Sequence, residues 1–287
     1  MPLIQIANDH LAVAVSPMGA EMASITDSGG QSWLWDGDPA FWSGRSPVLF
    51  PMVGRAPGDH VSIEGRRFPM GQHGFARRSP FELVASGDDF CRFVLRSSPT
   101  SQAIYPFAFE LAVEHRLEGG AVVVTAEVAN RDRRPMPFGI GFHPAFVWPL
   151  PGCEGLEHEV VLDNGSEPVL KRLTGGLVQH EARPSPFKAG RLVLDHDLFA
   201  ADAILFPEGA GTGLRYRAGN REVRFSWENL PNLALWSKPG AGFVCLEPWH
   251  GTAAMVDGSD ALEARPYGVV LQPGARGRYG FRAELVG

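Results

Sequence analysis

The stretch that decides the fold is Phe107–Val128, which reads FAFELAVEHRLEGGAVVVTAEV. In its first half the odd positions are apolar, apart from His115, and the charged residues lie at even positions. This period of two is typical of a half-buried β-strand. After Gly119-Gly120 the alternation resumes with valine and alanine on one face and Thr125 and Glu127 on the other. We therefore predict a long β-hairpin that turns at the two glycines.

Paired runs of the same kind recur on both sides of this hairpin. Each pair is separated by a short stretch rich in Gly, Asp, Asn or Pro, as expected for turns. The pairs are Phe81–Ser86 with Phe90–Arg96, Leu214–Arg217 with Arg221–Phe225, and Val269–Leu271 with Arg278–Leu285. The best helical candidates, Pro39–Trp42 and Leu198–Asp202, are one turn each, and Leu150–Pro186 is interpreted as long loops.

The composition agrees with a fold built from short strands and turns. Of the 287 residues, 34 are glycine and 24 are proline, which disfavours long helices, and 44% are hydrophobic, which suffices for a sizeable core. No shift in composition and no linker marks a boundary. We predict an all-β protein, an antiparallel sandwich or barrel, that forms a single domain over residues 1–287.

The net charge and the cysteine content limit the partners, the metal sites and the cellular location that we expect for the protein. The formal net charge is −6 and the basic residues are scattered, which argues against nucleic acid as the main partner. The three cysteines are widely spaced, so neither a disulfide framework nor a cysteine-based zinc site is indicated. We find no signal peptide and no apolar run long enough for a membrane span. We expect a soluble, cytoplasmic protein.

Three histidines have unusual surroundings, whereas His10, His60, His158, His180 and His196 lie in polar segments and are expected on the surface. His143 lies in the apolar, aromatic segment GFHPAF, where the following proline disfavours the helical region and keeps the histidine extended. His73 lies in MGQHGFAR between two glycines, which permit unusual backbone angles and close approach of a ligand. His250 ends the third unusual segment, FVCLEPWH.

Glu247 repeats the pattern of His143, because it ends an apolar run and precedes a proline. A carboxylate in such surroundings is costly unless it is paired or used. Histidine and glutamate have reference pKa values of about 6.5 and 4.3, so together they suit general acid and base roles near neutral pH. Tryptophans could supply flat faces for the C–H side of a sugar ring: Trp35, Trp42, Trp236 and Trp249.

Five segments, in this order and spacing, resemble the aldose 1-epimerase (galactose mutarotase-like) family, and in particular its compact bacterial LacX-type branch. They are Gly19-Ala20-Glu21 with Ser24-Ile25, LFPMVGR at 49–55, QHGFAR at 72–77, GFHPAF at 141–146 and CLEPW at 245–249. The resemblance extends from about Val13 to Leu285. It implies a large antiparallel β-sandwich and a cofactor-free interconversion of the α and β anomers of a free sugar, with no metal.

The resemblance also implies roles for individual residues. His143 corresponds to the family's general acid for the ring oxygen, and Glu247 corresponds to the general base on the anomeric hydroxyl. His73 and Arg55 correspond to substrate-binding positions, and Trp249 adds an aromatic wall. Asp202 is the counterpart of the substrate-gripping aspartate, although its surrounding motif departs from that of typical galactose mutarotases. The partner implied is a small-molecule sugar, and the protein is expected to be a monomer or a homodimer.

Several alternatives stay open at this stage. A metal hydrolase would use His73, His143 and Glu247 as ligands if they converge, and a glycoside hydrolase would need a second carboxylate beside Glu247. A sugar-binding or sensing protein would keep the cleft without turnover. A hexose 6-phosphate mutarotase would need extra cations near the cleft, for which the candidates are Arg55, Arg77, Arg78 and Lys238. Of these, Arg77 and Arg78 are expected to be solvated.

Overall fold

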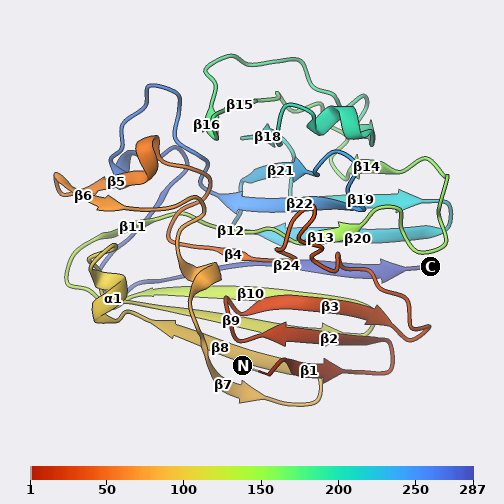
Figure 1. The fold of residues 1–287 in the computed structure, drawn as a ribbon, viewed down its shortest axis with the longest axis horizontal. Helices are drawn as coiled ribbons and strands as arrows, with labels where there is room; N and C mark the ends of the chain where they lie inside the picture. Colours follow the sequence, from red (N-terminus) through yellow and green to blue (C-terminus); the bar gives the residue numbers. More distant parts are fainter. Residues whose placement is uncertain (1) are drawn as a thin grey trace.

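A computed structural model describes residues 2–287, and two large antiparallel sheets dominate that part of the chain. Figure 1 shows their strands running side by side across the molecule. The larger sheet has nine strands in the order β17-β14-β19-β20-β24-β10-β9-β8-β7. These are β7 (Glu82–Ser86), β8 (Phe90–Arg96), β9 (Phe109–Glu118), β10 (Ala121–Asn130), β14 (Glu159–Leu162), β17 (Arg191–Val193), β19 (Gly213–Ala218), β20 (Arg221–Glu228) and β24 (Arg276–Val286).

The smaller sheet has six strands and packs on the larger one. Its order is β18-β21-β22-β12-β4, and β13 also pairs with β22. These are β4 (Val48–Leu49), β12 (Ile140–Phe142), β13 (Ala145–Val147), β18 (Ile204–Phe206), β21 (Asn232–Trp236) and β22 (Phe243–His250). The predicted fold class, a large antiparallel β-sandwich, is confirmed.

Shorter elements surround the two sheets. A three-stranded sheet is formed by β1 (Ile4–Ala7), β2 (Leu11–Ser16) and β3 (Glu21–Asp27). Three two-stranded pairs are β5 (His60–Ile63) with β6 (Arg66–Pro69), β11 (Met136–Phe138) with β23 (Val269–Leu271), and β15 (Leu173–Thr174) with β16 (Leu177–Val178). The helices are α1 (Pro99–Gln102) and the 3-10 turns η1 (Pro57–Asp59), η2 (Ala76–Arg78), η3 (His196–Phe199) and η4 (Leu262–Ala264). Within residues 2–287 no helix has the length and apolar character to cross a bilayer.

The hairpin that decides the fold forms as predicted. β9 and β10 pair with Glu118 opposite Ala121, so the chain turns at Gly119-Gly120. The apolar positions of both strands, such as Val113 and Val124, belong to the main core between the sheets. The outer face carries cross-strand ion pairs between arginine and glutamate side chains, such as Arg92–Glu114 and Arg282–Glu118. Period-two patterning therefore sets which face of the large sheet meets the core.

Three sequence interpretations need correction. Val269–Leu271 and Arg278–Leu285 are strands, but they do not pair with each other: β23 pairs with β11, whereas β24 lies between β10 and β20. The region Leu150–Pro186 is more than loops, because β14 is an interior strand of the larger sheet. Leu198–Asp202 overlaps η3, and Pro39–Trp42 forms a turn instead of a helix.

Alternate residues of the smaller sheet also lie on opposite faces. In β22, Val244 and Leu246 face the main core, whereas Phe243, Cys245 and Trp249 pack in two separate clusters on the outer face. Strand β21 behaves in the same way, with its leucines inside and its alanine and tryptophan outside. The smaller sheet therefore has a second side-chain layer on the face away from the larger sheet. This layer carries the candidate site.

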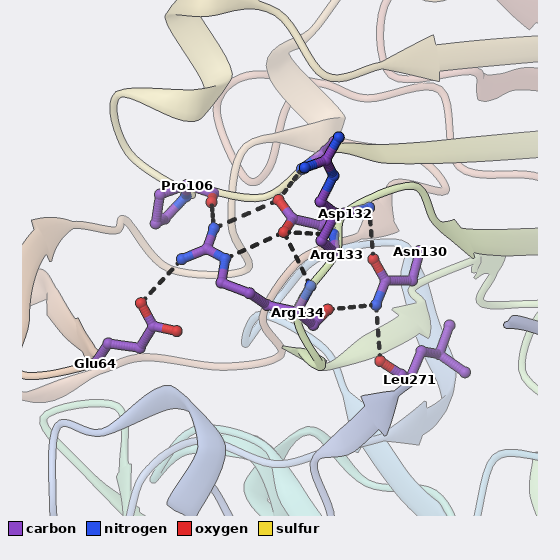
Figure 2. A network of polar contacts seen from close by, with 8 residues as sticks. Glu64, Pro106, Asn130, Asp132, Arg133, Arg134 and Leu271 are labelled. Carbon is purple, nitrogen blue, oxygen red and sulfur yellow. Dashed lines mark hydrogen bonds and ion pairs between the residues drawn. The ribbon is translucent and has the colours of Figure 1, made fainter. Parts of the chain in front are cut away.

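The loop between β10 and β11 fixes the start of the segment that leads into β12 (Figure 2). Asn130 Nδ2 donates hydrogen bonds to the carbonyl oxygens of Arg134 (2.8 Å) and Leu271 (2.9 Å). The Arg134 guanidinium contacts Asp132 at 3.1 Å and Glu64 at 2.9 Å. Hydrogen bonding to Arg134 lowers the pKa of Asp132 to about 2. The loop thus ties the larger sheet to β23 and to the turn between β5 and β6.

Candidate active site

The pairing of β22 with β12 and β13 brings His143 and Glu247 together. β12 pairs Gly141 with Trp249, and β13 pairs Ala145 with Cys245. Continuing either register by two residues places His143 opposite Glu247. Residues directly opposite each other in an antiparallel pair have side chains on the same face within contact distance. The two candidates therefore meet as cross-strand neighbours on the outer face of the smaller sheet.

The backbone pairing of β22 is interrupted beside two prolines, Pro144 and Pro248. His143 and Pro144 lie between β12 and β13, and the N–H of Leu246 donates to the Pro144 carbonyl oxygen at 3.1 Å. The next backbone nitrogen on this edge of β22 belongs to Pro248, which has no proton to donate and lies beside the gap. β22 can therefore continue through Pro248 to His250, and Glu247 is extended within the strand instead of at its end.

Geometry and burial make the pair chemically unusual. His143 Nε2 lies 3.0 Å from Glu247 Oε2, and the two residues are 7% and 1% exposed. Among residues 2–287 neither oxygen of Glu247 finds a well-aligned hydrogen-bond donor. Burial raises the pKa of Glu247, the charge of His143 partly offsets this rise, and the charge of Asp202 adds to it. Such a carboxylate is a stronger base than an exposed one.

The pair lines a cavity of about 330 Å³ with aromatic walls. Trp42, Trp236 and Trp249 line it together with His143 and Glu247. The Trp42 ring centroid is 4.9 Å from that of His143 at an interplanar angle of 31°, and Trp236 approaches His143 edge-on at 5.7 Å. These contacts restrict rotation of the imidazole. The cavity is of the size and character of a small-molecule site.

Two further residues that the sequence analysis singled out, Trp35 as a possible sugar-ring face and His250 as a histidine in an unusual segment, lie outside the cavity lining. Trp35 packs on Phe243 and donates its indole N–H to the carbonyl oxygen of Trp42 at 2.9 Å, so it supports the Trp42 loop. His250 Nδ1 contacts the carbonyl oxygen of Asn229 at 2.8 Å. Both have structural roles in the described chain.

His73 lines the cavity in a fixed protonation state. Its backbone has a positive φ of 65°, and its N–H donates to the Gly54 carbonyl oxygen at 2.8 Å. The Gly54 N–H in turn donates to His73 Nδ1 at 3.1 Å, which leaves the ring proton on Nε2. Burial, followed by the charge of His143, holds the pKa of His73 well below its usual value. His73 is therefore a neutral hydrogen-bond donor.

Gly74 makes this loop conformation possible. Its φ is +70°, and a Cβ atom there would lie 2.2 Å from the carbonyl oxygen of Phe50. A side chain at this position would collide with rigid backbone, so the loop that carries His73 requires glycine.

Asp202 also lines the cavity, as predicted for a substrate-binding acid. It follows η3 with a positive φ of 74°. One carboxylate oxygen accepts the Ala203 N–H at 2.8 Å. The Arg172 guanidinium holds the segment by donating to the carbonyl oxygens of Leu198 (2.8 Å) and Asp202 (3.3 Å). The residue is exposed.

Arg55 is the one predicted site residue that the structure does not bring to the cavity lining. Its guanidinium makes two hydrogen bonds with the carboxylate of Asp59, at 2.7 and 2.8 Å. Its aliphatic part packs against Gly176, which does line the cavity. Arg55 therefore supports the β15–β16 turn at the cavity rim, and a direct contact with a sugar stays a prediction.

Two further arginines lie at the site: Arg77, named from the sequence only as a candidate cation for a phosphorylated sugar, and Arg265, which the sequence did not indicate. Arg77, expected to be solvated, lines the cavity, and its Nε is buried without a hydrogen-bond partner among residues 2–287. Arg265 is 8% exposed and donates to the carbonyl oxygens of Val53 (2.8 Å), Arg55 (3.0 Å) and Thr252 (2.9 Å). It thereby joins the two loops that carry Gly54 and Ala253 into the cavity wall.

Comparison with known proteins now identifies the family. The family model described as aldose 1-epimerase matches residues 2–281. This chain belongs to the aldose 1-epimerase family. Two LacX proteins of Lactococcus lactis subsp. lactis, one plasmid-encoded and one chromosomal, are 30% and 31% identical over 278 residues, which is 92% of each chain. The resemblance seen in the five sequence segments is confirmed.

Solved structures of aldose 1-epimerase relatives share the whole fold. A galactose mutarotase related enzyme from Lactobacillus acidophilus has a TM-score of 0.95 at 28% identity and covers 100% of this chain and 98% of its own. A galactose mutarotase-like protein from Lactobacillus casei has a TM-score of 0.90 at 25% identity over 99% and 100% of the two chains. The two-sheet architecture is therefore common to these proteins.

This aldose 1-epimerase family member also carries a thiol behind the catalytic candidates. Cys245 lies two residues before Glu247 on the same face of β22 and is completely buried. Burial, followed by the charge of Glu247, raises the pKa of the thiol well above its usual value. His143, Cys245 and Glu247 each offer one ligand atom, and the three atoms lie within 4.8 Å of one another. This set contains Cys245 in place of the His73 considered for a metal hydrolase.

Proposed function

We propose that the protein is a mutarotase that interconverts the α and β anomers of a free aldose. The observation that carries this proposal is the buried contact of His143 Nε2 and Glu247 Oε2 at 3.0 Å on the cavity wall. Anomer exchange needs an acid at the ring oxygen and a base at the anomeric hydroxyl, and these two oxygens are bonded to the same carbon. An acid and a base must therefore lie close together, as these two residues do.

The proposed reaction is a pair of proton transfers. Glu247 removes the proton of the anomeric hydroxyl while His143 protonates the ring oxygen, so the bond between C1 and the ring oxygen breaks and an open-chain aldehyde forms. Rotation about C1–C2 presents the other carbonyl face. His143 then removes the proton from the hydroxyl that attacks C1, and Glu247 returns its proton to the new anomeric oxygen. General acid–base catalysis of this kind typically contributes about 10²–10⁴-fold.

The remaining cavity residues would orient the sugar. His73 offers the Nε2 proton to a sugar oxygen, and Asp202 accepts hydrogen bonds from hydroxyl groups. Trp249 presents an apolar ring to the C–H face of the sugar. Orientation of this kind lowers the entropic part of the barrier without further chemistry.

Replacing each proton-transfer group tests the proposal. We expect Glu247→Gln and His143→Asn each to slow anomer exchange by at least about 100-fold, because each removes one of the two proton transfers. Polarimetry of freshly dissolved sugars and NMR exchange spectroscopy measure the rate, and circular dichroism checks the fold. Folded variants that equilibrate anomers at the wild-type rate would show that these residues do not carry the reaction.

One observation favours a hexose 6-phosphate as an alternative substrate. Of the four candidate cations, Arg77 lines the cavity, whereas Lys238 Nζ donates to the Phe41 carbonyl oxygen and Arg78 lies on a separate groove. An arginine without a carboxylate partner suits a phosphate group. We expect Arg77→Gln to slow exchange of a phosphorylated hexose selectively if this alternative holds. An equal effect on free and phosphorylated sugars would exclude it.

A sugar-binding or sensing protein is the non-catalytic alternative. It would bind an aldose in calorimetry yet leave the rate of anomer exchange at its spontaneous value. The retained His143–Glu247 pair argues against it, because binding alone does not need both proton-transfer groups.

A further inference from the structure

The face of the smaller sheet that carries the proposed catalytic pair also carries a set of metal-ligating atoms. A nitrogen of His143, the Cys245 sulfur and an oxygen of Glu247 lie within 4.8 Å of one another. Their positions follow from the sheet register, because His143 is opposite Glu247 and Cys245 precedes Glu247 by two residues on the same face. Strand β22 therefore holds Cys245 and Glu247, and the short gap between β12 and β13 holds His143 opposite them.

The carboxylate of this set has few partners. Glu247 is 1% exposed, and neither of its oxygens has a well-aligned hydrogen-bond donor among residues 2–287, although His143 Nε2 lies 3.0 Å from Oε2. This buried carboxylate therefore lacks full compensation for its lost hydration. A divalent cation beside it would supply that compensation, and imidazole, thiolate and carboxylate are all ligands that zinc accepts.

We propose that His143, Cys245 and Glu247 bind Zn²⁺ as an inhibitory site. Zinc bonds of about 2.0–2.3 Å need only small shifts of ligand atoms that already lie within 4.8 Å of one another. The Cys245 thiol loses its proton to solvent as the sulfur–zinc bond forms, while Glu247 binds as a carboxylate and His143 as a neutral imidazole. The fourth position of the metal faces the cavity.

The consequence for activity rests on the proposed mutarotase function. A bound Zn²⁺ occupies the lone pairs through which His143 and Glu247 would exchange protons with the sugar. It also blocks the end of the cavity where C1 of the sugar would lie. Zinc is therefore expected to inhibit anomer exchange in competition with the sugar, and a chelator is expected to restore the activity.

Cadmium binding tests the site without any sugar. Cd²⁺ coordinated by a thiolate gives an ultraviolet charge-transfer band, which we expect in the wild-type protein at one equivalent of metal. Cys245→Ser should lack this band, whereas the matched control Cys153→Ser, which changes a buried cysteine far from the cavity, should keep it. Absence of the band from the wild type, or its persistence in Cys245→Ser, would overturn the proposal.

Inhibition by zinc provides the second measurement. Loss of even an outer-shell partner weakens metal sites by about 10–100-fold, so Cys245→Ser should need at least about tenfold more Zn²⁺ for half-inhibition. Equal inhibition of this variant and the wild type would contradict the three-ligand site. If neither Cys245→Ser nor Cys245→Ala folds, His143→Asn decides instead: it should bind Cd²⁺ at least about tenfold more weakly, and unchanged affinity would overturn the proposal.

The two proposals fail in different ways. A wild-type protein that shows the cadmium band but exchanges the anomers of no sugar would retain the metal site and lose the proposed function. A protein that exchanges anomers and shows no cadmium band would retain the function and lose the metal site.

Discussion

Glu247 combines the requirements of a base with a cost to stability. Glu247 is 1% exposed, and His143 Nε2 lies 3.0 Å from its Oε2. Burial raises its pKa, so the folded protein holds this proton more tightly than the unfolded chain does. A group of this kind stabilises the fold relatively less as the pH rises through its folded pKa. Function and stability therefore make opposite demands on this residue.

The pH dependence of the free energy of unfolding should show the cost of burying the Glu247 charge. Glutamine at position 247 has no charge to bury, so we expect Glu247→Gln to gain stability relative to the wild type as the pH rises from 4 to 8. At the acid end the glutamate is mostly protonated in both states, so the two proteins should differ least there. Urea unfolding at several pH values measures the difference. A difference that is constant or shrinks with rising pH would contradict an elevated pKa.

The pH dependence of activity tests the environment of the same residue. Because Glu247 must be deprotonated to act as a base and its pKa is raised, activity should be lost on the acid side at a pH above the ordinary glutamate value of 4.5. The charge of Asp202 contributes to this rise, so Asp202→Asn should move the acid limb of kcat/KM to lower pH. Asp195→Asn, an equal charge change outside the cavity lining, is the control and should leave the limb in place.

At the scale of elements, the loop between β10 and β11 is a test of stability away from the cavity. The pKa of Asp132 is lowered to about 2 by Arg134, so its charge stabilises the fold above the unfolded pKa near 3.8 and this contribution is lost as the pH falls toward 2. Solvent screens pairs near the surface, so we expect Asp132→Asn to cost about 1–2 kcal/mol at pH 7. Denaturant titrations should show this cost shrinking at pH 3, and a pH-independent cost would contradict the assigned pKa.

The elements differ in how well the sequence predicts them. Long alternating runs such as β9 and β10 were predicted because period two persists over ten residues in each. β14 was missed because it spans only Glu159–Leu162 and lies among prolines, glycines and charges. The pairing of β23 and β24 was wrong because proximity in sequence favoured a hairpin, whereas β24 instead completes the sheet between β10 and β20.

Site residues also differ in how well the sequence predicts them. Those with a distinctive local sequence could be predicted, whereas those whose partners are distant in sequence could not. His143 and Glu247 could be predicted because each is a polar residue in an apolar run before a proline. His158, expected on the surface, is 3% exposed, and its Nε2 accepts the Leu150 N–H at 2.9 Å. Arg265 has no comparable signal, because its partners are backbone carbonyls such as Val53, more than 200 positions away. For Arg55 the sequence did contain an alternative partner to the sugar, because Asp59 lies four residues further along the chain and forms an ion pair with it.

At the scale of the whole molecule, one strand joins the two halves of the larger sheet. β24 pairs along β10 on one side and along β20 on the other. On the side of the first pairing lie the strands β7, β8, β9 and β10, and on the side of the second lie β14, β17, β19 and β20. Without β24 both halves would have an unpaired edge and an uncovered part of the core. The integrity of the sandwich therefore depends on residues 276–286.

Truncation measures this dependence. We expect removal of residues 276–287 to prevent cooperative folding, because it leaves two long strand edges and the core neighbours of Tyr279 and Phe281 exposed. Loss of the sheet signal in circular dichroism and aggregation in gel filtration would be the readouts. Removal of Gly287 alone, which lies beyond β24, is the control and should leave the protein folded. A truncated protein that unfolds cooperatively would contradict the central role of β24.

The position of β24 also affects how the protein is made. During synthesis β10 and β20 leave the ribosome before β24. The edges of these two strands therefore stay unpaired until β24 emerges. Long non-local pairings of this type form slowly, and unpaired edges invite association between nascent chains. Strand β22 also emerges before β24, so the face that carries Glu247 is synthesised before the larger sheet can close behind it. Chaperones that shield strand edges should therefore matter most until β24 has emerged and paired.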